Sequence, residues 1–298
     1  MAIIESNNRH AEASRKTLAY LKELSDSLDG WDFKSENNGV KLYSKTVKGQ
    51  PLPVVRGDAI LPGNEYTPAQ VASAATSPGS RKVWDDKFDS VEVREVYTFR
   101  ELLLWTKVKA PWPLSPRDMC TTIIRDISDD AAYSSLVSVE DAAIPEVDGN
   151  VRVTLPLSGW KVTNGPEGIV LTNVSQIGTT GPVPKALIVS VQQQIPMATA
   201  KVINYVQTYG YPPYIIDTTA ITGKEQFTHN DKKYSIEIKS GEVDSFVKID
   251  ISKKLYPNGI NVSINGSATH KIEDGANGNK VLVIESIGGS ATAVVTHA

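Results

Sequence analysis

The sequence is poor in the residues that form covalent cross-links and metal sites. Its 298 residues include one cysteine, Cys120, and four histidines. One cysteine cannot close an intramolecular disulfide or complete a cysteine-based zinc site, so nothing in the chain requires an oxidising compartment. We therefore expect a cytoplasmic protein with no metal ion and no cofactor.

Neither charge nor hydrophobicity is concentrated in the chain. The formal net charge is -3, which is too small to draw the whole protein to nucleic acid or to an anionic membrane. No run of about 18 apolar residues could span a bilayer, and the first ten residues lack the apolar core of a signal peptide. The sequence predicts a soluble protein without a nucleic-acid partner, for which any membrane contact is local.

Signatures of catalysis are also missing. The sequence has no G-x-S-x-G elbow, no H-E-x-x-H pair and no Walker-type glycine loop. The histidines all lie near a terminus or in the C-terminal tail: His10, His229, His270 and His297. Because the usual general base is absent from the main part of the chain, we expect a protein that is not an enzyme.

Hydrophobic periodicity predicts three helices. Residues 11–28 carry leucines on one stripe, and Gly30 follows as a stop signal. Residues 67–76 form a shorter helix between Pro68 and a Pro-Gly pair. A long helix is predicted over residues 184–208. Its apolar face consists of Leu187, Val191, Ile195, Ala198, Val202 and Val206.

Between the first and the last helix, apolar residues alternate with polar ones, which predicts β-strands. The predicted strands cover residues 40–43, 54–61, 91–99, 102–109, 119–127, 133–139, 151–157 and 169–177. Their short, turn-rich connections are typical of antiparallel neighbours. The order of elements predicts an α+β fold in which a curved antiparallel sheet wraps the long C-terminal helix. The space between sheet and helix is filled either by side chains or by a ligand.

The C-terminal tail has a different character. Alternating strands there are separated by Asn-Gly pairs that are typical of hairpin turns. We therefore predict two domains, a main domain over residues 1–214 and a small all-β extension over residues 215–298. The extension stabilises the main domain or docks a protein partner, and its sequence indicates no function of its own.

Three short segments carry a recognisable pattern: Val-Arg-Gly-Asp-Ala at residues 55–59, Arg-Lys-Val-Trp-Asp at residues 81–85 and Ser-Pro-Arg-Asp at residues 115–118. In this order and at these separations, they resemble the START (steroidogenic acute regulatory protein related lipid transfer) family. The Gly-Trp pair at residues 30–31 and the Gly-x-x-Pro segment at residues 181–184 also fit. The resemblance covers about residues 11 to 210 and implies a helix-grip fold around a tunnel for one sterol, phospholipid, ceramide or similar lipid.

The resemblance also implies which residues line the tunnel. Met119, Thr121 and Ile123 share one face of a predicted strand, and the resemblance turns that face toward the tunnel. Arg125 lies in the same phase and either faces the interior or reaches solvent. Cys120, on the opposite face, packs behind the sheet. The lining residues implied in this way are Trp105, Met119, Thr121, Ile123, Leu187, Val191 and Ile195.

Arg81 and Asp85 are further candidates for ligand contact. In the phosphatidylcholine transfer member of the family, an arginine at the place of Arg81 meets the lipid phosphate, and Asp85 matches its aspartate partner. A guanidinium group suits a pair of phosphate oxygens. Alternatively, an ion pair between Arg81 and Asp85 holds a helix to the sheet. The positions that match the choline cage are Thr106 and Met119, so we expect no preference for choline. Ile123 stands where sterol carriers have an arginine.

The loop over residues 107–116 matches the segment that lies at the tunnel mouth in this family. Trp112 and Leu114, with Lys107 and Lys109 nearby, form the combination expected where a protein touches a membrane interface. We therefore predict transient membrane contact by Trp112 and Leu114. The alternative is that Trp112 packs onto the C-terminal helix.

The expected function is to bind and transfer a single lipid in an internal hydrophobic tunnel without covalent chemistry. One alternative is a helix-grip enzyme similar to the aromatic cyclases, which would need polar groups converging in the tunnel. The candidates for those groups are Thr121, Tyr133, Asn173 and Gln176. The other alternative is a lipid-responsive interaction scaffold whose C-terminal extension binds a protein.

Overall fold

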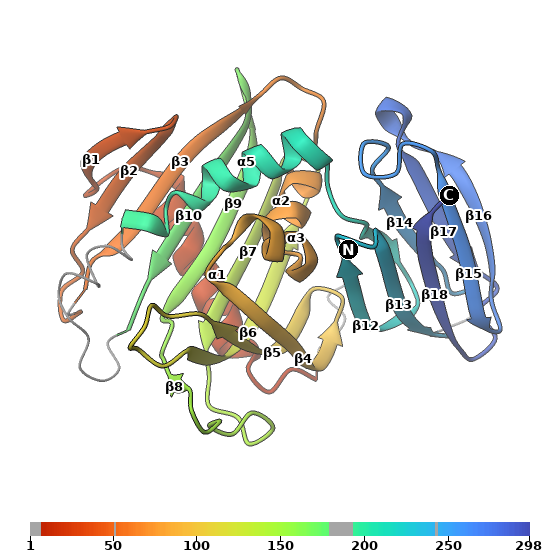
Figure 1. Cartoon of the computed structure of the whole chain (residues 1–298), viewed down its shortest axis with the longest axis horizontal. Helices are drawn as coiled ribbons and strands as arrows, with labels where there is room; N and C mark the ends of the chain where they lie inside the picture. Colours follow the sequence, from red (N-terminus) through yellow and green to blue (C-terminus); the bar gives the residue numbers. More distant parts are fainter. Residues whose placement is uncertain (1–6, 51, 179–192, 242–243) are drawn as a thin grey trace. The chain divides into compact units, whose positions relative to one another are not determined.

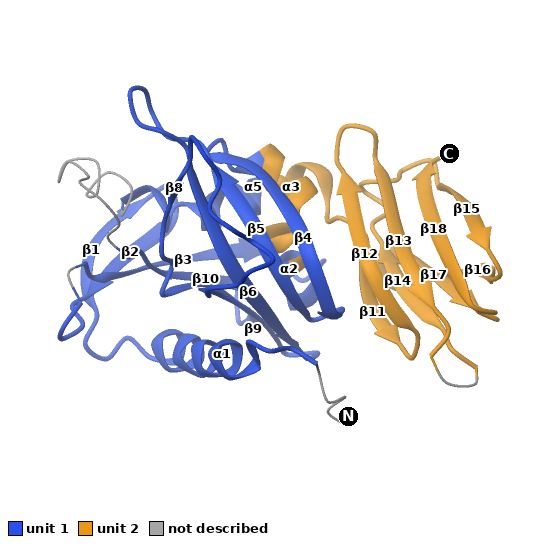
Figure 2. Cartoon of the chain, turned by 90° about the horizontal axis from the view of Figure 1, so that it is seen from below, with its two compact units in different colours: residues 1–72, 84–204 blue, residues 73–83, 205–298 orange. Residues whose placement is uncertain are grey.

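The computed structural model of the chain describes residues 7–50, 52–178, 193–241 and 244–298. These residues divide into two compact units (Figure 2). Unit 1 comprises the described parts of Met1–Ala72 and Trp84–Asn204, and unit 2 comprises Ser73–Val83 and the described parts of Tyr205–Ala298. A short segment thus groups with the C-terminal residues. The sequence-based boundary between residues 214 and 215 stays a prediction.

Unit 1 is built on a large antiparallel sheet (Figure 1). Its strands lie in the order β1-β2-β3-β10-β9-β7-β6-β5-β4, and β8 pairs with β6 in parallel. The strands are β1 Asp32–Asn37, β2 Val40–Lys45, β3 Val54–Pro62, β4 Phe88–Thr98, β5 Glu101–Val108, β6 Arg117–Ile127, β7 Ala131–Ser138, β8 Val151–Arg152, β9 Leu157–Gly165 and β10 Gly168–Gln176. The central pair of β3 and β10 joins segments more than 100 residues apart in the chain, so the sheet depends on long-range pairing.

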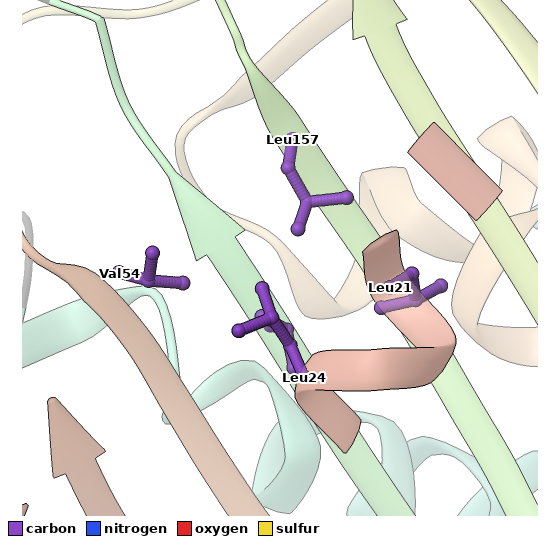
Figure 3. Packing of buried hydrophobic residues seen from close by; sticks show 5 residues of the cluster. Leu21, Leu24, Val54 and Leu157 are labelled. Carbon is purple, nitrogen blue, oxygen red and sulfur yellow. The ribbon is translucent and has the colours of Figure 1, made fainter. Parts of the chain in front are cut away.

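Two helices cover opposite faces of this sheet, with α5 in front of it and α1 behind it in Figure 1. α1 (Ala11–Asp26) forms one cluster with three strand residues (Figure 3). The cluster consists of Leu21, Leu24, Val54, Leu157 and Val174. α5 (Ala198–Tyr209) and the residue before it form a second cluster with β2 and β3. That cluster consists of Val40, Leu42, Ala59, Met197, Ala200 and Ile203. We call the sheet face toward α5 the inner face and the face toward α1 the outer face.

The prediction of one unbroken helix over residues 184–208 is wrong at Pro196. Residues 179–192, with Leu187 and Val191, lie outside the described residues. In the part that the structure describes, residues 195–197 form a bend and a turn, and regular helix begins at Ala198. Proline has no N–H to donate and its ring clashes with the preceding turn, so it interrupts a helix. No helix in the described part of the chain is long and apolar enough to cross a membrane.

Two other elements differ from the sequence-based prediction. Most of β9 was not predicted, because Gly159 and Lys161 interrupt its apolar alternation. Gly159 lies under α1, where an added Cβ would be 2.6 Å from a Leu21 methyl group, so the glycine lets the helix approach the sheet. The Pro-Gly pair at residues 78–79 does not end the helical region. It follows α2 (Pro68–Thr76) and begins α3 (Pro78–Trp84), since proline fits the first turn of a helix.

The described residues of unit 2 contain two four-stranded antiparallel sheets. Of the three Asn-Gly pairs predicted as hairpin turns, only residues 277–278 connect two directly paired strands. The strand orders of the two sheets are β11-β14-β17-β16 and β12-β13-β18-β15. The strands are β11 Tyr214–Thr218, β12 Ile221–Thr228, β13 Lys233–Lys239, β14 Val247–Ile251, β15 Ile260–Gly266, β16 Thr269–Asp274, β17 Lys280–Glu285 and β18 Ser290–His297, with the short helix η1 Ala276–Gly278 before β17. Alternate residues of β13 and β14 are buried: Tyr234, Ile236, Ile238, Val247, Ile249 and Ile251.

A half-buried histidine in unit 2 is expected to make its stability depend on pH. The Tyr205 hydroxyl lies 2.8 Å from Nδ1 of His229, whose ring centroid is 4.6 Å from that of Tyr209. Burial, and to a lesser extent Lys232, lowers the pKa of His229. Between the folded pKa and pH about 6.5, the unfolded chain therefore binds more protons than the folded one. We expect the free energy of unfolding to fall as the pH drops through that value and to level off below the folded pKa.

Urea unfolding between pH 5 and pH 7.5 measures this dependence. His229→Gln should flatten the profile, because glutamine does not titrate. His270→Gln is the matched control, since His270 is exposed in β16 and its loss should leave the profile unchanged. A wild-type profile without slope between pH 5 and pH 7 would contradict the prediction.

Candidate ligand-binding face of the sheet

A row of directly paired residues crosses the inner face of unit 1. Starting from Gly57 in β3, the row continues through Asn173 in β10, Trp160 in β9, Ser134 in β7 and Arg125 in β6. Directly paired residues of antiparallel strands project to the same face of a sheet. The row therefore brings one amide, one hydroxyl, one indole and one guanidinium group to the inner face from four strands, and β3 contributes a glycine.

The row is identified as inner by the contact of Gly57 with the turn before α5. A Cβ added to Gly57 would lie 2.4 Å from the carbonyl oxygen and 2.7 Å from the Cβ of Pro196. The absence of a side chain thus lets this turn rest directly on β3. At the middle of the row, the Trp160 ring meets Trp84 edge to face, with centroids 6.2 Å apart.

Three buried side chains on the inner face have a polar atom without a hydrogen-bond partner among the described residues. These atoms are Asn173 Oδ1, Ser134 Oγ and Thr121 Oγ1, and their residues are 3%, 2% and 1% exposed. Asn173 Nδ2 donates to the Gly159 carbonyl at 3.1 Å, which leaves Oδ1 to accept a bond from elsewhere. Because buried polar groups in proteins are almost always hydrogen-bonded, these atoms are available to a ligand or to ordered water, as are Ser135 Oγ and Gln176 Nε2 on the outer face.

Apolar side chains flank Thr121 on the inner face. Thr121 is paired with Leu104 in β5, and Ile123 is paired with Leu102 in β5 and Leu136 in β7. Leu104 and Ile123 are buried. Met119, at the start of the same alternation in β6, is also buried. The inner face is thus mostly apolar, with a few neutral polar groups, which is the usual composition of a small-molecule site.

Arg125 contributes a cation to the end of the row near β5. It is half-buried, and its Nη1 donates to the Phe99 carbonyl at 3.1 Å. Its backbone lies in phase with the inner face, and its half-exposed side chain leaves both orientations open. The bond to the backbone fixes the guanidinium group at the margin of the face.

Trp105 lies on the outer face and does not join Met119, Thr121 and Ile123. It is paired with Cys120, and the two belong to one buried cluster. Its indole Nε1 donates to Asp118 Oδ2 at 2.8 Å. Trp105 and Met119 therefore cannot line one cavity on one face of this sheet, contrary to the sequence-based grouping.

Cys120 packs behind the sheet, as the alternation along β6 predicted. It is buried, and this burial raises the pKa of its thiol. A thiol that stays protonated near neutral pH is a poor nucleophile. Among the described residues there is also no group of three or more His, Cys, Asp or Glu side chains that could hold a metal ion.

The four polar candidates for an enzyme do not converge. Thr121 and Asn173 face inward. Tyr133 packs with the outer cluster under α1, and Gln176 is paired with Leu157 of the same cluster. Ser134 was missed, because the face of each β7 residue depends on the register of β7 against β6.

The remaining predicted site residues are not members of the row. Arg81 is in α3 and groups with unit 2, whereas Asp85 follows α3 and groups with unit 1; both are half-buried. Ile195 is half-buried in the turn before α5. Trp112 is 92% exposed, so the alternative that it packs onto the C-terminal helix is wrong. Leu114, in the same loop, is half-buried.

Comparison by sequence identifies one distant relative. No protein-family model matches the chain. An uncharacterized protein of Pseudomonas aeruginosa is 25% identical over 181 residues, which are 58% of this chain and 84% of that protein.

Comparison by structure finds a similar fold in several solved structures, of which three are described. Human STARD10 has a TM-score of 0.58 at 19% identity, with 70% of this chain and 84% of that chain covered. Human StAR-related lipid transfer protein 5 has a TM-score of 0.58 at 20% identity, with 66% and 98% covered. A fragment of a STAR-related lipid transfer protein from Xanthomonas axonopodis has a TM-score of 0.50 at 24% identity, with 59% and 97% covered. With its large antiparallel sheet and few helices, the chain therefore contains a START-like domain.

Proposed function

We propose that this chain binds a single lipid molecule against the inner face of the unit 1 sheet and transfers it between membranes without covalent chemistry. The observation that carries the proposal is the START-like fold, whose solved neighbours include proteins named for lipid transfer. A mostly apolar inner face supports it, because each Å² of apolar surface removed from water contributes about 25 cal/mol. Several hundred Å² of lipid surface would then contribute on the order of 10 kcal/mol, with no need for a catalytic group.

The residues proposed to touch the lipid are those predicted from the sequence that lie on the inner face of β6. They are Met119, Thr121 and Ile123. Ile195, in the turn before α5, is a further candidate. Arg81, Asp85, Leu187 and Val191 stay predictions, and Trp105 is left out because it lies on the outer face.

Native mass spectrometry of the purified protein tests the proposal. We expect a single bound lipid per chain, or uptake of one lipid after the delipidated protein is incubated with liposomes of phospholipid and sterol. A chain that retains no lipid and takes up none from such liposomes would refute lipid binding.

Two neighbouring isoleucines of β6 provide a matched test of where the lipid lies. Ile123 faces inward and Ile124 faces outward, and both are buried. Ile123→Trp should reduce lipid uptake, because the larger ring occupies space that the lipid would take. Ile124→Trp should overpack the outer core and cost about 1 to 3 kcal/mol of unfolding free energy, with lipid uptake retained. Equal uptake by both folded variants would contradict an inner-face site.

Membrane contact by the loop that carries Trp112 is the second part of the proposal. The Trp112 side chain is 92% exposed, so its apolar ring is in contact with water in the free protein. An indole in this position can be buried at a membrane interface. Lys109, in the same loop, is exposed and can approach lipid phosphates.

Trp112→Ala is expected to slow lipid transfer between vesicles about tenfold, which corresponds to about 1.4 kcal/mol of lost interfacial burial. The equilibrium affinity for lipid should stay the same, because the contact is made only during loading and release. Phe33→Ala is the matched control, since Phe33 is 58% exposed in β1, away from this loop. Vesicle-to-vesicle transfer of a fluorescent lipid measures the rate. Equal rates for wild type and Trp112→Ala would remove this loop from the proposal.

A further inference from the structure

The buried polar atoms of the inner face carry information about the ligand. Asn173 Oδ1 can only accept a hydrogen bond, and its orientation is set because Nδ2 donates to the Gly159 carbonyl. The hydroxyl of Ser134 can donate or accept. Asn173 and Ser134 lie in one row with β9 between their strands, so their backbones are about 10 Å apart.

The charges of the row bear on the ligand as well. The row has no carboxylate, and its one cation, Arg125, donates to the Phe99 carbonyl at the margin of the face. A phosphodiester has no hydrogen-bond donor for Asn173 Oδ1. Its buried oxygens would need charged donors as neighbours, whereas Asn173 Oδ1 is itself an acceptor. An alcohol has a donor and no charge to desolvate.

We infer that the polar end of the ligand is an uncharged alcohol that donates a hydrogen bond to Asn173 Oδ1, with Ser134 as a second hydrogen-bonding position for the same lipid. The inference rests on the proposed function and specifies its ligand as a lipid alcohol, such as a sterol or a diacylglycerol. Thr121, further along the inner face of β6, offers a hydroxyl for another polar atom of the ligand.

The outer face supplies controls that match these residues in burial and in chemistry. Ser135 follows Ser134 in β7 and is also buried, with a hydroxyl that has no partner among the described residues. Gln176, in β10 with Asn173, has a buried Nε2 without a partner there. Both residues face α1, so their substitution should not touch the ligand.

Affinity is measured for pairs of lipids that differ only in the alcohol. One pair is cholesterol and its methyl ether, and the other is dioctanoylglycerol and its acetate ester. Dioctanoyl phosphatidic acid serves as the charged probe. In at least one pair we expect the alcohol to bind about tenfold more tightly than its capped partner, and more tightly than phosphatidic acid. Asn173→Leu should remove this preference, and Ser134→Ala should weaken alcohol binding about fivefold. Ser135→Ala and Gln176→Leu should change neither.

The outcomes separate the inference from the proposed function. Binding of capped lipids or phosphatidic acid as tightly as the alcohols, or an unchanged preference in Asn173→Leu, overturns the inference and leaves lipid binding intact. Failure to bind any probe, with no lipid retained on purification, overturns the proposed function. If Asn173→Leu does not fold, Ser134→Ala provides the test, because it removes only a hydroxyl that lacks a partner in the described chain. Equal alcohol affinity in Ser134→Ala and Ser135→Ala would then overturn the inference.

Discussion

Asp118→Ala is expected to lower the free energy of unfolding by about 3 kcal/mol, the low end of the range for breaking a buried ion pair. Asp118 is fully buried at the start of β6 and accepts three hydrogen bonds. They come from Trp105 Nε1 at 2.8 Å, and from Nε and Nη2 of Arg152 at 3.0 Å each. The substitution leaves the indole and most of the guanidinium group buried without these acceptors. The low end applies because the Arg152 side chain is 22% exposed.

Asp126→Ala is the control for Asp118→Ala. The ion pair between Lys22 and Asp126 is 2.7 Å long, but both side chains are more than a third exposed. Its loss should cost less than about 1 kcal/mol. Urea unfolding of the two variants makes the comparison, and equal losses would show that the Asp118 network does not stabilise the sheet.

Acid should act on the same network. Burial alone would raise the pKa of Asp118, but hydrogen bonds from Arg152 and Trp105 outweigh burial and hold the pKa below its usual value. The unfolded chain therefore binds the proton first. The stability that Asp118 contributes is complete above pH about 3.9 and is lost as the pH falls from there through the folded pKa. Asp118→Ala should lack this part of the acid dependence.

Gly57→Ala is expected to cost about 3 kcal/mol, at the upper end of the usual range for overpacking. The new Cβ would be 2.4 Å from the Pro196 carbonyl oxygen and 2.9 Å from its carbonyl carbon. These are backbone atoms, so the turn before α5 must move away from β3. Lipid uptake should fall as well, because this turn rests on Gly57, which is paired with Asn173.

Gly63→Ala is the control for Gly57→Ala. Gly63 has a φ of +92° and nothing within 4 Å of an added Cβ, so alanine there is strained but does not clash. Its cost should be about 1 kcal/mol. Wild-type stability of Gly57→Ala would show that Pro196 does not rest on the sheet.

Local patterns predicted most elements and failed where a residue's role comes from its neighbours in space. The leucine stripe of α1 and the alternation in β13 and β14 were sufficient, because each segment buries one face. β9 lacks that signal, since Gly159 is selected by contact with Leu21 of a distant helix. The apolar helical spacing continues across Pro196, so the pattern predicted one unbroken helix. The helix is interrupted there because proline has no N–H to donate and its ring clashes with the preceding turn.

The grouping of Trp105 with Met119 shows the limit of alternation more sharply. Alternation correctly placed Met119, Thr121 and Ile123 on one face of β6. Which β5 residues share that face depends on the register between β5 and β6, and a slip of one residue moves every side chain to the other face. The structure pairs Trp105 with Cys120, so the indole meets Asp118 on the outer face.

By itself, the sequence determined the class of the fold, the alternation within each strand and the lack of the usual catalytic signatures, because these depend on residue types and on spacing within one segment. Only the tertiary structure decided that Gly57, Asn173, Ser134 and Arg125 lie in one row. Three sheet pairings create that row, β3 with β10, β10 with β9, and β9 with β7, before β6 completes it. Such pairings join segments far apart in the chain, and their register is set by packing on both faces of the sheet, which no local pattern encodes.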